Sequence, residues 1–233
     1  YPMVLLFMSV ASVIFLLTWV LPKFMVMFAG KEDLLPTATS MLLAISRFMQ
    51  HQWYILVAVA AVLVVGLICG LRTPQGREYL DRFKLRAPIL KRMFRSLYIT
   101  RSLQAMGELT NAGVPILDSL SITAEISGNI LYKRTWMRVR ESVEGGNKIV
   151  HYLLQDKQLP KSVIQMISAG EESGRLGEVL SEVSEFYAKE LKDTIKAVTG
   201  LIEPIMIVVM GGVVGFIAMS IILPVFSMSK LVK

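Results

Sequence analysis

Three long apolar segments alternate with polar segments along the chain. They cover residues 3–21, 55–71 and 201–226, and Glu203 is the only ionisable side chain of the last one. A bilayer core of roughly 30 Å requires about 20 residues of helix at about 1.5 Å per residue. The pattern therefore predicts three transmembrane helices, and we assign residues 1–22, 54–71 and 200–226 to them.

The segment between the first two predicted spans, residues 23–53, is mixed in character. After a polar break at residues 31–36, apolar side chains recur at helical spacing, namely Met41, Leu42, Ile45, Phe48 and Met49. Trp53 and Tyr54 follow, and such amphipathic rings favour the headgroup boundary. We predict a loop outside the bilayer core that carries an amphipathic interfacial helix.

Basic residues are distributed unequally around the predicted spans. The 23–53 segment holds only Lys23, Lys31 and Arg47, whereas a dense series follows the second span: Arg72, Arg77, Arg82, Lys84, Arg86, Lys91, Arg92, Arg95 and Arg101. Lys and Arg collect on the cytoplasmic side of membrane proteins. We therefore expect residues 72–199 in the cytoplasm, with the 23–53 loop and the 227–233 tail on the extracytoplasmic side.

Residues 72–199 show helical periodicity and no alternating strand pattern. Breaks at residues 111–113, Gly128, residues 145–146, Pro160 and residues 173–174 divide the stretch from residue 90 onward into a six-helix bundle. Asn129 is a suitable N-cap for the third helix. The sixth helix continues in phase into the third span, which predicts an all-α, polytopic membrane protein with a rigid connection at that point.

Composition supports the membrane class. The chain of 233 residues is 54% hydrophobic and 18% charged, with a mean hydropathy of +0.56. A soluble chain of this length would expose too much apolar surface. The net charge of +7 is explained by the cytoplasmic basic residues, so we expect no nucleic-acid partner. The single cysteine, Cys69, lies in an apolar run and excludes an intrachain disulfide.

Motifs that would indicate an enzyme are missing from the sequence. The chain has no G-x-x-x-x-G-K-[ST] phosphate loop and no G-x-G-x-x-G turn after a strand. His51 and His151 are the only histidines, and the predicted topology puts them on opposite sides of the membrane. We therefore predict no catalytic residues, no metal site and no cofactor.

A polar segment between two apolar-faced helices is the first candidate site. It reads Gly170, Glu171, Glu172, Ser173 and Gly174. One interpretation is a tight turn with Gly174 at positive φ and solvated carboxylates. The other is that Glu171 forms fixed hydrogen bonds or a charged pair that holds the hairpin, or that it docks a partner.

The third span contains the second candidate site. Glu203 and Pro204 lie at its start, where the acid is either hydrated at the headgroups or functional. Pro204 with Gly200 is the expected position of any bend at the membrane border. Gly211 and Gly215 form a G-x-x-x-G spacing that permits close helix approach, either within the subunit or at an intersubunit seam.

An ordered series of residues resembles a known family, the polytopic inner-membrane platform proteins of type IV pilus assembly and type II secretion, called the secretion-F family. The series extends over residues 1 to 226. It comprises Pro88, Gly113, Val114, Pro115, Leu120, Asn129, Pro160, the Gly170 to Gly174 segment, Leu176, Glu203, Pro204, Gly211 and Pro224.

The resemblance implies a non-enzymatic platform in the bacterial inner membrane that forms a homo-oligomer within membrane lipid. Its implied partners are a cytosolic hexameric assembly ATPase, pilin or pseudopilin subunits and other inner-membrane assembly proteins. Family members carry two similar cytoplasmic domains, so we expect this chain to be the latter portion of a longer protein. A membrane transporter or permease subunit is the alternative, and it would require polar residues along a route through the bilayer.

Overall fold

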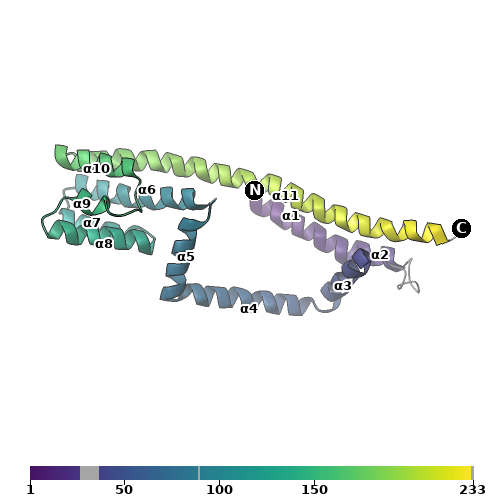
Figure 1. Cartoon of the computed structure of the whole chain (residues 1–233). Coiled ribbons are helices and arrows are strands. Elements are labelled where there is room, and N and C mark those ends of the chain that lie inside the picture. Colours follow the sequence, from purple (N-terminus) through teal and green to yellow (C-terminus); the bar gives the residue numbers. More distant parts are fainter. Residues whose placement is uncertain (27–36, 89, 232–233) are drawn as a thin grey trace. The chain divides into compact units, whose positions relative to one another are not determined.

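The computed structural model describes residues 1–26, 37–88 and 90–231, except for the side chains of residues 25, 224, 225 and 227–231. Every regular element in these ranges is helical, as the sequence predicts (Figure 1). The predicted polar break at residues 31–36 and the end of the tail lie outside the described residues, as does the side chain of Pro224.

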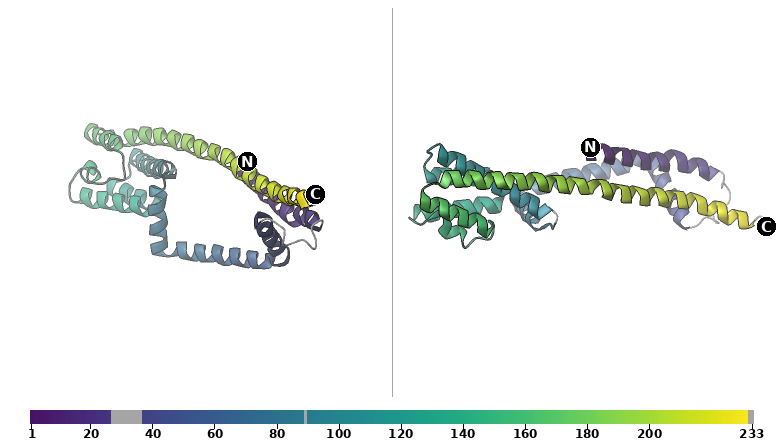
Figure 2. Two further views of the ribbon diagram at one scale, coloured as in Figure 1. Left: turned by 45° about the vertical axis from the view of Figure 1, so that its right-hand side comes forward. Right: turned by 90° about the horizontal axis from the view of Figure 1, so that it is seen from above.

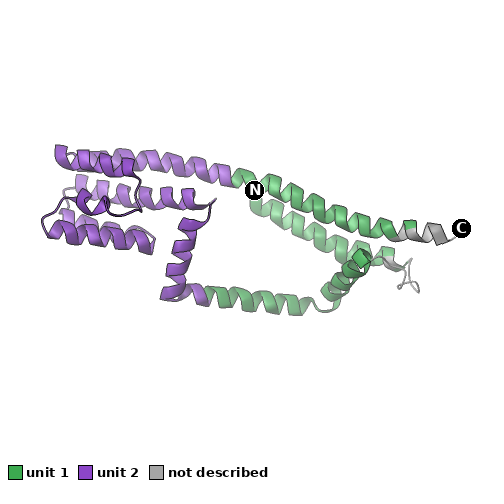
Figure 3. Ribbon diagram, viewed as in Figure 1, with its two compact units in different colours: residues 1–68, 199–233 green, residues 69–198 purple. Residues whose placement is uncertain are grey.

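The chain forms two compact units, coloured separately in Figure 3. Unit 1 comprises residues 1–68 and 199–233, and unit 2 comprises residues 69–198. The longest helix, α11 (Leu176–Leu231), contributes residues to both units. The predicted sixth helix and third span are therefore parts of one helix, and Pro204 lies in its interior.

Unit 2 consists of α5 (Pro74–Arg86), α6 (Leu90–Asn111), α7 (Ile116–Ile126), α8 (Ile130–Glu144), α9 (Ile149–Leu153), α10 (Lys161–Ser173) and the first part of α11. The six predicted helices are present, and α5 is an addition to them. Asn129 caps α8 as predicted, because its Oδ1 accepts a hydrogen bond from the Leu131 amide at 2.9 Å.

The core of unit 2 is built from the inward faces of α6 to α11. Trp136 of α8 is its largest fully buried side chain. Side chains from the neighbouring helices surround the same core, including Tyr98, Leu103, Met106, Leu120, Tyr132, Leu153, Ile167 and Leu180. In both Figure 1 and Figure 2, α10 lies alongside the start of α11. Burial of this apolar face is the main stabilisation of the bundle.

Polar contacts hold α5 against α8. The Arg134 guanidinium donates to both carboxylate oxygens of Glu78, each at 2.9 Å. The Asp81 carboxylate accepts from the Ile130 amide at 3.0 Å, at the start of α8. No residue of α5 is fully buried. Leu85 of α5 packs against the core, and charge and capping add to this contact.

Unit 1 consists of α1 (Pro2–Phe15), the π-helix η1 (Leu16–Val20), α2 (Leu21–Met25), α3 (Thr37–His51), α4 (Trp53–Arg72, through residue 68) and the second part of α11. Three helical segments of the described chain are long and apolar enough to cross a membrane: Pro2–Phe24, Trp53–Arg72 and Leu176–Leu223. Each overlaps one of the three predicted spans, 1–22, 54–71 and 200–226.

A small apolar cluster joins three parts of unit 1. Leu17 and Leu21 pack with Leu42 of α3 and Ile217 of α11. In contrast, α4 has no buried residue in the described structure. A helix that is apolar on all sides is suited to a lipid environment.

Candidate functional site

Glu171 lies in the last turn of α10 and binds the start of α9. Its Oε1 accepts from the Ile149 amide at 2.8 Å, and its Oε2 accepts from the Val150 amide at 3.4 Å. The first amides of a helix have no intrahelical acceptor, and the helix dipole favours a carboxylate there. The structure therefore shows fixed hydrogen bonds rather than simple solvation, but they bind α9 and not the predicted hairpin of α10 and α11.

The neighbouring Glu172 is placed differently. Its Oε1 lies 3.5 Å from the Lys148 Nζ, and the two side chains are 61% and 63% exposed. An exposed ion pair of this kind contributes little to stability. Adjacent acids thus have separate roles, since only Glu171 satisfies backbone groups.

Gly174 ends α10 in the left-handed conformation with φ of 70°. The Gly174 and Arg175 amides both donate to the Gly170 carbonyl, so the chain reverses immediately into α11. A Cβ on Gly170 would lie 3.1 Å from the Val179 Cβ and 3.3 Å from the Leu176 Cα. Gly174 therefore permits the turn, and Gly170 permits the close contact of α10 with α11.

A second close contact, between α6 and α11, was not identified from the sequence. A Cβ on Gly177 would lie 2.0 Å from the Asn111 Oδ1, and one on Gly107 would lie 3.2 Å from the Gly177 carbonyl oxygen. The Asn111 side chain also donates to the Ser181 hydroxyl at 3.3 Å. The sequence does contain a sign of this contact, which is a glycine inside each of the two helical patterns. Glycine in a helix costs about 1 kcal/mol relative to alanine, so its presence indicates close packing at that position.

The other four predicted site residues lie in unit 1, along α11. The Glu203 Oε1 accepts from the Tyr1 hydroxyl at 3.3 Å. Pro204 has no amide to donate to the Gly200 carbonyl four residues earlier. Positions 211 and 215 face open space within the described structure, because a Cβ at either would meet no atom within 4 Å. Packing of the G-x-x-x-G spacing against another helix stays a prediction.

Two carbonyl oxygens of the π-helix in unit 1 accept hydrogen bonds from side chains of α3. Pro22 cannot donate to the carbonyls of Leu17 and Thr18, which precede it by five and four residues. The Ser46 hydroxyl donates to the Leu17 carbonyl at 2.5 Å. The side-chain amide of Gln50 donates to the Thr18 carbonyl at 2.9 Å. Unpaired carbonyls are costly in an apolar environment, so these contacts attach α3 to the first span.

The same contacts change the interpretation of α3. Of the predicted apolar face, Leu42 is buried, whereas Met41, Ile45 and Phe48 are exposed. Two polar side chains, Thr39 and Ser46, are buried beside Leu42, and the Thr39 hydroxyl donates to the Ser220 carbonyl at 2.7 Å. The side of α3 toward the protein thus combines hydrogen bonds with the apolar contacts of Leu42 and Met49, whereas an apolar stripe faces outward, which suits contact with lipid.

Among the described residues, no group of three His, Cys, Asp or Glu side chains is arranged to hold a metal ion. The fold and the contacts define an all-α protein with three segments able to cross a membrane. A separate helical unit occurs between the second and the third of these segments, held by glycine contacts and by capped helix ends.

The family of type II secretion system (T2SS) protein F matches residues 102–224, more than half of the chain. The chain belongs to this family. It is 30% identical over its whole length to the type IV pilus assembly protein PilC of Myxococcus xanthus, and 31% identical to the type IV pilus assembly protein TapC of Aeromonas hydrophila. It is 33% identical to the type II secretion system protein F of Pseudomonas aeruginosa.

The chain spans 56% of the length of the first two relatives and 57% of the third. These relatives include both pilus assembly and type II secretion proteins at similar identity. The sequence resemblance to the secretion-F family is therefore confirmed.

Proposed function

We propose that this chain is part of a non-enzymatic inner-membrane platform that couples a cytosolic assembly ATPase to the polymerisation of pilin or pseudopilin subunits. The family membership carries this proposal, because the relatives are type IV pilus assembly and type II secretion system proteins. The chain itself offers a helical unit and three membrane-spanning candidates, which are the parts such a role requires.

The proposed topology is that of a multi-pass protein of the bacterial inner membrane. Residues 72–199 would be cytoplasmic, and the 23–53 loop and the 227–233 tail extracytoplasmic. The basic residues that follow the second span support this orientation. Reporter fusions after residue 52 and after residue 145 would test it. Cytoplasmic activity of the first fusion, or periplasmic activity of the second, would contradict the orientation.

The proposed coupling element is α11. Its first part packs against α6 through Gly107 and Gly177, and against α10 through Gly170. The same helix continues into the third membrane-spanning candidate, where Glu203, Pro204, Gly211 and Gly215 lie. Unit 2 would bind the assembly ATPase. The third membrane-spanning candidate would contact pilin subunits or another copy of the protein. A continuous helix favours transmission because it has no loop between its two parts.

Crosslinking tests the motor contact. Photo-crosslinkers at exposed positions of unit 2, such as Met166 and Phe186, should capture the assembly ATPase of the same cell, and exposed positions of α4 should not. Reversing charge at Glu171 and Glu172 together should reduce filament extension or secretion. Normal extension combined with no ATPase capture at any exposed position of unit 2 would contradict the proposed function.

A further inference from the structure

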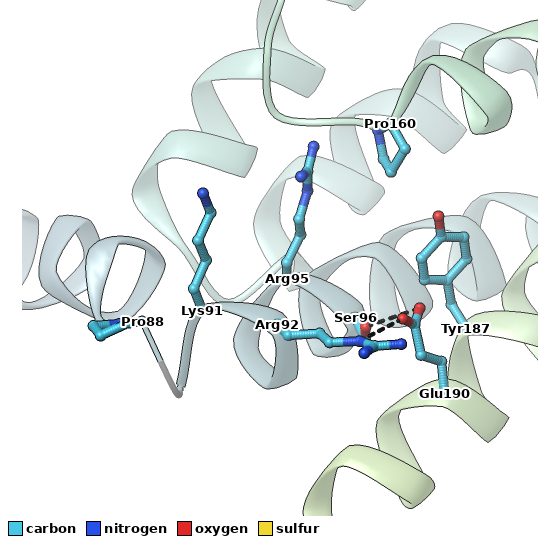
Figure 4. A pocket seen from close by; sticks show the side chains of 8 residues that line it. All are labelled: Pro88, Lys91, Arg92, Arg95, Ser96, Pro160, Tyr187 and Glu190. Carbon is cyan, nitrogen blue, oxygen red and sulfur yellow. Dashed lines mark hydrogen bonds and ion pairs between the residues drawn. The ribbon is translucent and has the colours of Figure 1, made fainter.

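Unit 2 contains a basic groove where α6, α10 and α11 meet. Two adjoining pockets of about 260 and 600 Å³ form it, and both are lined by Arg95 and Pro160. We call the two together the Arg95 groove. Figure 4 shows the smaller pocket, in which Lys91 and Arg95 extend from α6 in the same direction and Tyr187 faces them from α11.

The lining of the Arg95 groove has more basic than acidic side chains. Five basic side chains line it: Lys91, Arg92, Arg95, Lys157 and Lys161. The acids in its lining are Asp156 and Glu190, and both have donors already. The Glu190 carboxylate accepts from Arg92 at 2.9 Å and from the Ser96 hydroxyl at 3.3 Å, as the dashed lines of Figure 4 mark. The Asp156 carboxylate accepts from the Gln158 amide at 2.9 Å and from the Thr135 hydroxyl.

The remaining cations have no acidic partner. Lys91, Lys157 and Lys161 are exposed and form no ion pair in the described part of the chain. Arg95 donates to the backbone carbonyls of Gln158 at 3.2 Å and of Lys157 at 3.5 Å. These bonds hold the loop before α10, with Tyr132 donating to the same Gln158 carbonyl. Lys157 is therefore presented from a loop held by these bonds, and Lys91 and Lys161 are presented from α6 and α10.

The larger pocket adds apolar surface to this charge. Leu154 is 70% exposed at its edge, although it is a large aliphatic side chain. Leu159, Pro160 and Ile164 also line this pocket. A volume of 600 Å³ lies within the usual range of ligand sites, about 300–1,000 Å³, and exceeds what a single phosphate needs. The groove thus combines an apolar surface with unpaired cations at its sides.

We propose that the Arg95 groove binds an acidic peptide segment of a partner protein, with an apolar side chain seated against Leu154 and Pro160 and carboxylates facing Lys91, Lys157 and Lys161. Charge complementarity carries the choice of occupant, because clustered Lys and Arg recognise acidic motifs. This inference goes beyond the platform role, since it assigns a docking chemistry to one surface and does not require that the partner be a motor.

The test uses the whole chain in detergent micelles and a short labelled peptide in which glutamates flank a leucine. The variant carries Lys157→Glu and Lys161→Glu. Its matched control carries Lys192→Glu and Lys196→Glu, which make the same charge change at exposed positions of α11 that line neither pocket. The groove variant should bind the peptide about tenfold more weakly than the parent, and the control within about twofold.

Three further measurements make the test specific. A peptide with glutamines in place of glutamates should bind more weakly than the acidic peptide, and added salt should weaken binding of the acidic peptide. Thermal unfolding of both variants should match that of the parent, because the substituted side chains are exposed. Equal binding of the peptide by groove and control variants would overturn the proposal. So would selective loss of binding to vesicles rich in anionic phospholipid, with peptide binding unchanged, since this would assign the groove to lipid headgroups.

Discussion

Glu171 shows how a single side chain connects two helices of unit 2. Its carboxylate accepts from two consecutive amides at the start of α9, while its backbone belongs to α10. A helix as short as α9 has little stability of its own, so its position depends on such external contacts. The adjacent Glu172 forms only an exposed pair with Lys148, and it therefore serves as the natural control.

Glu171→Gln should lower the free energy of unfolding of unit 2 by about 1 kcal/mol, because an uncharged amide is a weaker cap that can accept at only one atom. Glu172→Gln should change it by less than about 0.5 kcal/mol. Hydrogen exchange of residues 149–153 in the detergent-solubilised chain measures both effects. Equal exchange in the two variants would show that the Glu171 contacts do not hold α9.

Glu78 links the stability of unit 2 to pH. Hydrogen bonding from Arg134, together with the charges of Arg134 and Arg82, holds the pKa of the Glu78 carboxyl below its usual value of 4.5. A group with a lowered folded-state pKa contributes stability that is fully present above its unfolded value, and this stability is lost as the pH falls through the lowered pKa.

We expect the docking of α5 to weaken as the pH falls below about 4.5, and Glu78→Gln to flatten this pH dependence. Hydrogen exchange of residues 74–86 at a series of pH values measures it. Glu125→Gln is the control, because Glu125 forms an exposed ion pair with Lys133 and none with α5 in the described structure. The same pH profile in the parent and in Glu78→Gln would exclude Glu78 as its source.

At the scale of elements, glycine contacts bring α6, α10 and α11 close together. Gly107 and Gly177 face each other across α6 and α11, and Gly170 faces Val179 across α10 and α11. In α11, Gly200 is a useful comparison because a Cβ there would meet no atom within 4 Å. Alanine should therefore affect stability differently at the two glycines of α11, Gly177 and Gly200.

Gly177→Ala should destabilise unit 2 by about 1–3 kcal/mol, because the new methyl group overlaps the Asn111 side chain and separates α6 from α11. Gly200→Ala should be neutral or stabilising by up to about 1 kcal/mol, since alanine favours the helix. Thermal unfolding of the purified chain compares them. Similar melting temperatures for the two variants would contradict the close contact.

The attachment of α3 to the first span follows from the π-helix and Pro22. Ser46→Ala with Gln50→Leu should leave the Leu17 and Thr18 carbonyls without these donors and cost about 1–2 kcal/mol. Faster proteolysis or hydrogen exchange within residues 37–51 would report the release of α3. Ser40→Ala is the control, because Ser40 bonds only within α3. Unchanged protection of α3 in the double variant would show that apolar packing alone holds it.

For the whole molecule, local sequence pattern predicted the helices and the turns but not their long-range contacts. The spans and the hairpin at Gly174 depend on neighbouring residues, so periodicity and glycine placement indicate them. The contacts of Glu171 with α9, of Gly107 with Gly177 and of Ser46 with Leu17 join residues far apart in sequence. No local pattern identifies such partners, and α5 was missed because none of its side chains is fully buried, so it has no strong apolar face.

We propose that α11 couples unit 2 to the membrane as a continuous helix. Two insertions of equal length after Val198, one of alanines and one of glycines, test it most directly in cells that assemble the filament or secrete its substrate. Both proteins should reach the membrane and retain the same ATPase crosslinks, because unit 2 is unchanged. Filament or secretion output should persist at least in part with the alanines, which continue the helix, and should be lost with the glycines, which interrupt it. Equal filament or secretion output from the two insertions would contradict coupling through a continuous α11.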